Sequence, residues 1–213
     1  FTWTCGNSSS LKIPIINNSK DIRLELTAFP FLGGDKIKKQ DVKITVNNVN
    51  IGQMTFEGNI SRTKFINIPN RILNKSIMDI TFEFPNAIVP IDLEVNEDSR
   101  PLALAFQEVV ITELVPYRFG ELIEFGKQGN AEDYQSEGWH FPEDGFTWSS
   151  SKAELSIPIL NIDSDIVLKA IIKNCLLQDG RVNILLDGKK IGEWIMDRGI
   201  KQERTITITK DLI

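Results

Sequence analysis

The feature that most constrains this chain is an internal repeat in its amino-acid sequence. Two stretches recur at the same spacing of 144 residues: residues 11–17 (LKIPIIN) as residues 155–161 (LSIPILN), and residues 21–24 (DIRL) as residues 165–168 (DIVL). Self-similarity at a fixed spacing is typical of a structural unit that occurs twice. We therefore predict that residues 1–73 and 146–213 are two copies of one β-sandwich half.

Further pairs of short segments extend the repeat with small changes in spacing. They are residues 1–3 and 146–148 (FTW in both), residues 42–44 and 182–184 (VKI and VNI), and residues 51–52 and 191–192 (IG in both). A change in the length of one loop accounts for a spacing that falls from 144 to 140 residues along the chain.

Alternating apolar residues predict β-strands, because every second side chain of a strand lies on the same face. The clearest alternation occurs at residues 22–28, 80–84 and 102–106, which we interpret as core faces. Many short strands with frequent turn signals predict an all-β fold of two tandem jelly-roll or β-sandwich domains related by the repeat. We expect these domains at residues 1–116 and 117–213, the second apparently lacking its C-terminal strands.

Turn residues support the same fold class. Asn47-Asn48 and Asp187-Gly188 each interrupt an alternating pattern and predict a two-residue hairpin turn, in which both central residues need positive φ. Helical periodicity is nearly absent, and we expect only a single helical turn at residues 69–73, echoed near the end of the chain.

The two copies differ in the strands that they contain. Copy one continues past residue 73 into strand-like segments at residues 77–84 and 103–114, which have no counterpart in copy two. Copy two instead has a strand-like lead-in at residues 120–126 and a loop through Asp144. An open sandwich edge invites pairing with another strand. We hypothesise that the chain is an excerpt of a longer polypeptide, or that strand exchange with the other copy or another molecule closes the edges and produces a homo-oligomer.

The composition argues against several classes of partner. The formal net charge is −5, whereas contacts with phosphates need a clustered Lys/Arg surface, so we predict no nucleic-acid binding. No apolar run approaches the roughly 20 residues of a membrane-spanning helix, so we predict no membrane insertion. Cys5 and Cys175 occupy positions that do not correspond between the copies, and we interpret them as free thiols.

Residues 138–148 (GWHFPEDGFTW) are the densest cluster of side chains typical of a binding site. Trp139 and Trp148 can stack on a sugar ring while His140 and Glu143 hydrogen-bond its hydroxyls, the mixture of apolar and polar groups that a ligand site needs. The alternative is structural, with Trp148 plugging the end of the sandwich and Glu143 tying the loop to backbone N–H groups. We predict Trp139, His140 and Glu143 as the main ligand contacts and Trp148 as a secondary one.

A second candidate region is the charged turn at residues 96–104 (NEDSRPLAL), which leads directly into an apolar strand. Arg100 can form a fork of hydrogen bonds to Asp98 and thereby fix the turn. In the alternative interpretation, Asp98 and Arg100 line the same end of the sandwich as the Trp loop and bind a sugar. Both interpretations remain open at this point.

We expect no catalysis within this chain. Glycosidase chemistry needs two carboxylates facing across a cleft, one of them with a raised pKa, and Glu143 with Asp144 is only a loop pair. The single histidine, His140, has no second imidazole or cysteine beside it with which to bind zinc. The sequence also contains no Gly-x-Ser-x-Gly motif, which a nucleophilic serine would need. We expect no cofactor, with Ca²⁺ as the alternative because oxygen ligands are abundant at residues 130–144 and 96–98.

Together, these motifs resemble the jelly-roll accessory modules that accompany bacterial polysaccharide glycosyltransferases, modules described as carbohydrate-binding-like or galactose-binding-like. The resemblance spans most of the chain and is carried by residues 138–139 (GW), 142–143 (PE), 146–149 (FTWS), 182–194, 84–87 (FPNA) and 98–104 (DSRPLAL). Two departures matter. Copy one has the FTW segment without a preceding Gly-Trp loop, and copy two has no Asp-x-Arg element.

The resemblance implies a role beside enzymes that build surface glycans. We expect a non-catalytic module that binds an oligo- or polysaccharide, or positions it for a neighbouring glycosyltransferase domain, in the cytoplasm. The alternative is a structural or interaction β-sandwich that docks a neighbouring domain or a second copy of itself without binding sugar.

Overall fold

The computed structural model describes residues 1–15, 19–160, 162–173 and 180–213. In this part of the chain the regular elements are short antiparallel β-strands and four 3₁₀ turns, so the predicted all-β fold class is confirmed. The contacts divide the chain into two compact units. The first unit comprises Phe1–Val115, Asn130–Phe141 and Thr147–Ser156, and the second comprises Pro116–Gly129, Pro142–Phe146 and Ile157–Ile213.

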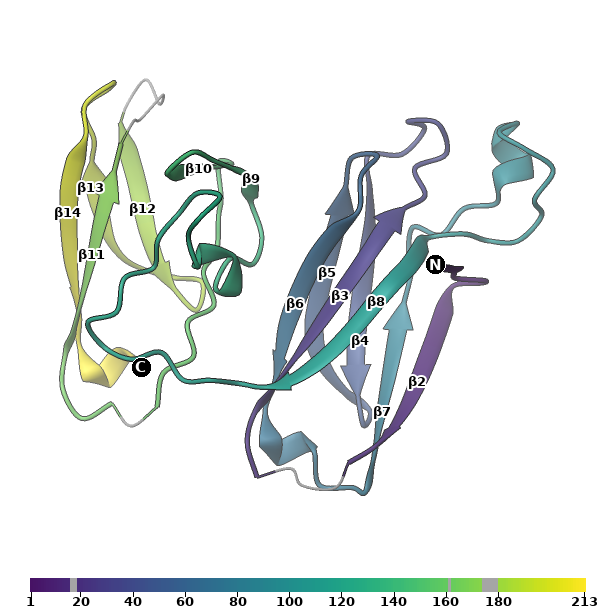
Figure 1. Ribbon diagram of the computed structural model, residues 1–213, viewed down its shortest axis with the longest axis horizontal. Helices are drawn as coiled ribbons and strands as arrows, with labels where there is room; N and C mark the ends of the chain where they lie inside the picture. The colour runs from purple at the N-terminus through teal and green to yellow at the C-terminus, as the bar shows by residue number, and fades with distance from the viewer. Residues whose placement is uncertain (16–18, 161, 174–179) are drawn as a thin grey trace. The chain divides into compact units, whose positions relative to one another are not determined.

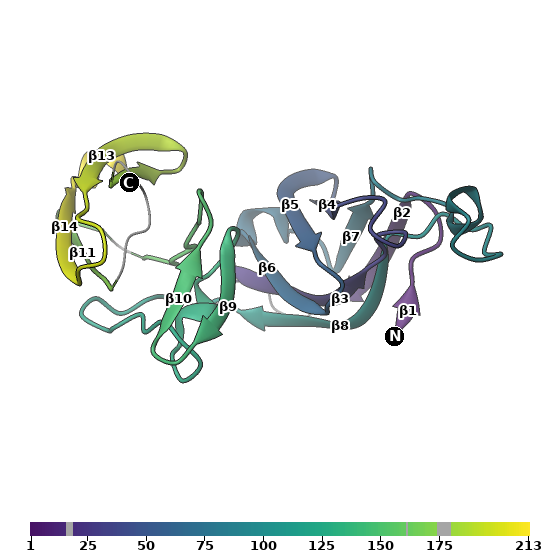
Figure 2. The same ribbon diagram turned by 90° about the horizontal axis from the view of Figure 1, so that it is seen from above.

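The first unit is a β-sandwich of two four-stranded sheets (Figure 1), consistent with a jelly-roll arrangement. One sheet has the order β1 (Thr2–Trp3), β8 (Leu104–Glu113), β3 (Ile22–Pro30), β6 (Arg62–Ile68). The other has the order β2 (Ser8–Pro14), β7 (Ile77–Glu83), β4 (Lys39–Val46), β5 (Val49–Glu57). Seen from above, β3, β6 and β8 form one layer and β4, β5 and β7 the other (Figure 2).

The core of the first unit lies between these two layers. Alternation puts Leu24 and Leu26 of β3 inward from one sheet and Val42 and Ile44 of β4 inward from the other, all with no exposed area. Phe82 of β7 is buried to the same extent. The core faces predicted from alternation are therefore the buried ones.

The second unit contains two two-stranded sheets. They are β11 (Ile166–Ile172) with β14 (Gln202–Ile208), and β12 (Arg181–Leu186) with β13 (Lys189–Ile195). Its apolar cluster is small, with Trp194 and Met196 at the centre. A further hairpin, β9 (Trp139–Glu143) with β10 (Phe146–Ser149), has residues in both units.

The hairpin turns and the helical turns at residues 70–72 and 210–212 follow the prediction, whereas the helical turns at residues 90–93 and 131–133 were not predicted. Asn47 and Asn48 have φ of 50° and 68°, and Asp187 and Gly188 have 48° and 79°, so both pairs adopt the positive φ that a type I′ turn needs. The 3₁₀ turns are η1 (Asn70–Ile72), η2 (Pro90–Leu93), η3 (Ala131–Asp133) and η4 (Lys210–Leu212). In the part of the chain that the structure describes, no helix is long and apolar enough to span a membrane.

Two aspects of the structure differ from the sequence-based picture. The units do not separate between residues 116 and 117, because residues 130–141 and 147–156 pack with the first unit. The FTW segments also have different pairing partners, since β1 pairs with β8 whereas β10 pairs with β9.

Cys5 is free and exposed. Cys175 and parts of the first matching stretch (residues 16–17 and 161) lie outside the described residues.

The two units offer a matched pair of core positions for a stability test. Ile44 has no exposed area, and we expect Ile44→Ala to lower the free energy of unfolding of the first unit by about 2–5 kcal/mol. The corresponding residue of the sequence repeat, Ile184, is only half-buried, and we expect Ile184→Ala to cost less than half as much. Denaturant unfolding followed by amide NMR signals of each unit measures both, and equal losses would contradict the burial difference.

Candidate functional site

The segment that contains the predicted Trp loop is anchored on the first unit by Arg23 of β3. The Arg23 guanidinium donates a hydrogen bond of 2.5 Å to the carbonyl of Asp133 and lies 4.1 Å from the centre of the Phe65 ring. Burial lowers the pKa of Arg23 below its ordinary value. Asn67 of β6 adds a bond of 2.9 Å to the hydroxyl of Ser156. Residues 130–136 and 154–156 are thus held against β3 and β6.

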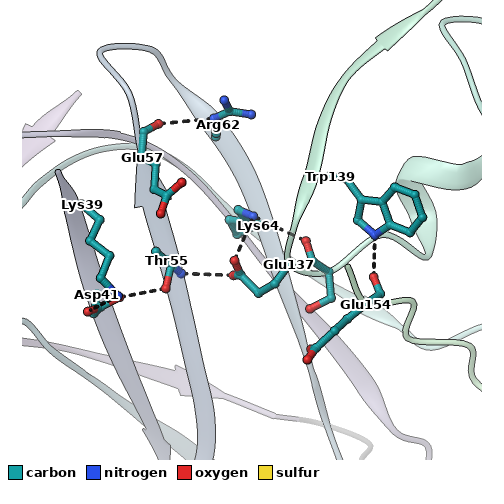
Figure 3. Close-up of polar contacts among 10 residues, drawn as sticks. Lys39, Asp41, Thr55, Glu57, Arg62, Lys64, Glu137, Trp139 and Glu154 are labelled. Carbon is teal, nitrogen blue, oxygen red and sulfur yellow. Dashed lines mark hydrogen bonds and ion pairs between the residues drawn. The ribbon is translucent and has the colours of Figure 1, made fainter. Parts of the chain in front are cut away.

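Glu137 extends this attachment to the open edge of the second sheet (Figure 3). Thr55 lies on β5, an edge strand, and its backbone N–H donates to Glu137 Oε1 at 3.2 Å. Lys64 Nζ lies 3.5 Å from Glu137 Oε2 and 3.4 Å from the carbonyl of Ser136. Thr55 also donates its hydroxyl to Asp41 at 2.8 Å. Glu137 therefore covers an edge N–H that would otherwise face solvent or another strand.

Trp139 is fixed by the same segment. Its indole N–H donates a 2.7 Å hydrogen bond to the carbonyl of Glu154 (Figure 3), and the backbone of Glu154 also bonds to Ser136 and Glu137. The preceding Gly138 has φ of 81°, and a Cβ there would lie 1.8 Å from the carbonyl oxygen of Lys152. The Gly-Trp pair of the sequence is therefore explained by a close backbone approach and a tethered indole.

The other residues predicted in this loop differ in their exposure. His140 and Glu143 are exposed, and Trp148 is half-buried in β10. The backbone carbonyl of Glu143 accepts a hydrogen bond of 3.0 Å from the backbone N–H of Lys127. Contacts place Glu143 in the second unit, whereas Trp139 and His140 belong to the first.

Phe141 is the aromatic side chain that the sequence reasoning missed. Its ring is 58% exposed, and the guanidinium of Arg62 lies 4.5 Å from its centre. Arg62 is on β6 and also donates to the carbonyl of Glu57 at 3.4 Å. The alternation of β9 could have indicated Phe141, because it follows Trp139 by two residues in an extended strand.

Asp98 and Arg100 form a forked pair of hydrogen bonds in the turn at residues 96–104, which is one of the two interpretations that the sequence left open. Arg100 Nε and Nη2 donate to the two carboxylate oxygens of Asp98 at 3.0 and 2.6 Å, and the Arg100 backbone N–H donates at 2.9 Å. Hydrogen bonds from the Arg100 side chain, then from its backbone, lower the pKa of Asp98 from 3.8 to about 2. The charges of this pair are therefore satisfied by each other.

The structure does not bring this pair together with the Trp loop. Gly6, which follows β1, donates to the carbonyl of Pro101, so the Asp98–Arg100 turn lies near the β1 edge of its sheet. Phe141 lies by Arg62 on β6, the opposite edge of the same sheet. The Asp98–Arg100 pair and the Arg62–Phe141 pair thus lie toward opposite edges of one sheet.

Other chemical features of the described residues are modest. No group of three or more His, Cys, Asp or Glu side chains in this part of the chain is placed to hold a metal ion. A shallow depression of about 190 Å³ is lined by Lys43, Asn50, Gly52 and Gln53, and it is small beside ligand pockets of roughly 300–1,000 Å³. The surface at Phe141 and Arg62 is the best candidate for ligand contact.

Comparisons with known proteins add little to this geometry. No family model matches the sequence, and no curated protein matches it. Among solved structures, the chain is similar to a carbohydrate-binding module, CBM36, in complex with calcium and xylotriose. That similarity has 11% identity and a TM-score of 0.31, and it covers 50% of this chain and 77% of the other. At these values it defines neither a site nor a ligand for this chain.

The lowered pKa of Asp98 can be measured directly. We expect its carboxyl to titrate near pH 2 by carbon NMR, and Arg100→Gln to move the pKa toward 3.8 because the side-chain donors are lost. A lowered folded-state pKa means that these contacts stabilise the turn above about pH 4 and are lost as the pH falls through about 2. An unchanged pKa in the variant would show that Arg100 is not the cause.

The role of Glu137 at the β5 edge is also testable. We expect Glu137→Ala to speed hydrogen exchange of the Thr55 amide and to lower the free energy of unfolding of the first unit by about 1 kcal/mol, because an acceptor is removed. Glu154→Ala is the matched control, since the Glu154 side chain pairs with exposed Lys152 while its backbone carbonyl accepts the hydrogen bond from Trp139. Equal effects of the two variants would exclude the proposed edge contact.

Proposed function

We propose that this chain is a non-catalytic carbohydrate-binding module whose ligand surface consists of Phe141 and Arg62. The observation that carries the proposal is the exposed Phe141 ring beside the Arg62 guanidinium. The Arg62 guanidinium lies over the ring, yet 58% of the residue remains exposed, so much of the side chain is open to solvent. An open aromatic face suits stacking against the apolar face of a sugar ring.

Polar groups around the ring supply the directional contacts that sugar hydroxyls need. A guanidinium has five N–H donors, and the hydrogen bond to Glu57 uses Nε alone. His140 is exposed but precedes Phe141 directly in β9, so its side chain lies on the opposite face of the strand and outside this surface. The mixture of one apolar face and few polar groups is typical of ligand surfaces.

The attachment of the loop to the first unit supports binding by this surface. Trp139 is tethered to Glu154, and Glu137 bonds to β5 and to Lys64, so the start of β9 is held before any ligand arrives. A preordered surface avoids the entropic cost of ordering side chains on binding. Because the surface is small and shallow, we expect dissociation constants in the millimolar to micromolar range, which corresponds to roughly −4 to −8 kcal/mol.

The carboxylates whose pKa is shifted favour a non-catalytic role. Arg100 lowers the pKa of Asp98, and Lys190, with a smaller contribution from Arg181, lowers that of Glu193. A glycosidase general acid needs the opposite, a pKa raised toward neutrality by an apolar environment. These two groups are therefore suited to ion pairs at the surface and not to proton donation.

A position beside a polysaccharide-synthesising glycosyltransferase is part of this proposal. It rests on the order of the motifs at residues 138–149 and 84–104, which resembles the accessory modules of such bacterial enzymes. In that setting the module holds the growing glycan near the catalytic domain on the cytoplasmic side of the membrane.

A second candidate function is an interaction module that binds a protein partner. It is favoured by the second unit, where β11 and β12 each pair with a single neighbouring strand in the described part of the chain. Unpaired strand edges are surfaces for strand addition.

The glycan-binding proposal predicts a specific effect of Phe141. In amide NMR titrations with a panel of neutral and acidic oligosaccharides, we expect signals of residues 139–141 and of Arg62 to shift. Phe141→Ala should weaken binding at least about tenfold, or about 1.4 kcal/mol, because the stacking face is lost. Phe119→Ala is the matched control, since Phe119 is 56% exposed but belongs to the second unit. The proposal fails if no oligosaccharide moves these signals, or if both variants weaken binding equally.

A further inference from the structure

We propose that the Arg62–Phe141 surface is specific for acidic sugars. In this inference the carboxylate of a uronic acid binds the Arg62 guanidinium, and the apolar face of the same sugar ring stacks on Phe141. The inference rests on the proposed glycan-binding function and deepens it by naming the class of sugar. It is carried by a guanidinium whose partners hold it in place without neutralising its charge.

The contacts of Arg62 are made to neutral groups. Its Nε donates a hydrogen bond of 3.4 Å to the backbone carbonyl of Glu57 (Figure 3), and the guanidinium lies 4.5 Å from the centre of the Phe141 ring. None of the ion pairs among the residues that the structure describes includes Arg62. The N–H donors of both terminal nitrogens therefore remain for a ligand.

The turn at Asp98 and Arg100 shows the contact that Arg62 lacks. Arg100 Nε and Nη2 donate to the two carboxylate oxygens of Asp98 at 3.0 and 2.6 Å. A planar guanidinium matches a carboxylate in this two-point geometry, and such charge-assisted hydrogen bonds are stronger than bonds between neutral groups. The carboxylate of a uronic acid presents the same two oxygens to Arg62.

The acidic side chains of the neighbouring strands are engaged by lysines. Glu137 Oε2 lies 3.5 Å from Lys64 Nζ, and Asp41 lies 3.1 Å from Lys39 Nζ. Glu57 is directly opposite Lys39 in the β4–β5 pair, so the two side chains share one face of the sheet. Carboxylates of the protein therefore do not supply the counter-charge of the guanidinium.

A basic loop lies at the same end of the first unit as Arg62. Arg62 is opposite Ala28 near the end of β3, and the loop that follows β3 carries the exposed side chains of Lys36 and Lys38. Asn59, in the turn before Arg62, donates a hydrogen bond of 3.3 Å from its side chain to Asp35 in this loop. In the described part of the chain, neither Lys36 nor Lys38 takes part in an ion pair.

The local charge matters more here than the net charge of −5. Charges separated by more than about 8 Å are largely screened at physiological ionic strength, so remote carboxylates oppose an anionic ligand only weakly. Lys36 and Lys38 attract an acidic glycan from a distance, whereas Arg62 supplies the directed contact.

The pairing of Arg62 with Phe141 favours an acidic sugar over a simple anion or a neutral sugar. A uronic acid carries its carboxylate directly on a ring that also has an apolar face, so one sugar residue can satisfy both side chains. A small anion has no face to stack on the exposed Phe141 ring, and a neutral sugar offers no charge to the guanidinium.

Matched ligands test the charge requirement. Oligosaccharides of galacturonate, glucuronate and mannuronate are each titrated beside their fully methyl-esterified forms, which keep the ring but lose the charge. We expect at least one acid to bind at least about tenfold more tightly than its ester and to shift the amide signals of Arg62 and Phe141. We expect this preference to shrink severalfold as the salt concentration rises from about 20 to about 500 mM.

Variants assign the preference to Arg62. We expect Arg62→Gln to bring the acid-to-ester affinity ratio to about one, and Arg62→Lys to keep only part of it because the fork is lost. Arg71→Gln is the matched control, since Arg71 is exposed in η1, beyond the other end of β6, and should leave the ratio unchanged. Lys36→Gln combined with Lys38→Gln should lower the ratio about twofold and flatten its salt dependence.

The outcomes separate the inference from the proposed function. Equal binding of acids and esters, or a preference for the esters, overturns the inference and leaves the proposed function standing. A preference that survives in Arg62→Gln also overturns it, because another cation is then the contact. A merely structural role of Arg62, such as support of Phe141, lowers both affinities equally and leaves the ratio unchanged. If no acidic, esterified or neutral oligosaccharide binds, the proposed function fails and the inference fails with it.

Discussion

The structure depends on two strands, β3 and β4, that are hydrogen-bonded along both of their edges. Each lies inside a four-stranded sheet, and their inward side chains meet across the core. Leu24, Leu26, Val42 and Ile44 on these two strands have no exposed area. Apolar alternation in a strand is therefore not sufficient for a core, as the half-buried residues of β11 and β12 show.

The outer strands of the first unit need a different kind of protection. β5 and β6 form the edges of the two sheets, and a segment distant in sequence supplies the contacts that cover them. Glu137 accepts the Thr55 N–H, and the Arg23 guanidinium holds the carbonyl of Asp133. The same contacts that protect the edge also order the start of β9, so the exposed Phe141 is displayed from a supported strand. Edge protection and the candidate ligand surface are thus physically linked.

Much of the architecture could be predicted because it is encoded by local patterns. Alternation indicated the core strands, paired turn residues indicated the hairpins at Asn47 and Asp187, and single helical turns occur at η1 and η4. The candidate site was predicted less well. Trp139 was selected for its indole, which the structure uses in a tether, whereas the neighbouring Phe141 is more exposed. Exposure depends on which side chains pack from other segments, and residue type does not reveal it.

By itself, the amino-acid sequence determined the all-β class and most strand and turn positions, because these depend on residues within a few positions of one another. It left the Asp98–Arg100 fork as one of two alternatives, and the strand-like segment at residues 120–126 is not a strand in the structure. Only the tertiary structure decided that residues 130–141 and 147–156 pack with the first unit. It also decided that the Asp98–Arg100 pair and the Arg62–Phe141 pair lie toward opposite edges of one sheet. The packing of these residues depends on long-range hydrogen bonds that Arg23 donates and Glu137 accepts. Their partners lie about 80 residues or more away in the sequence, and no periodic pattern of the sequence indicates them.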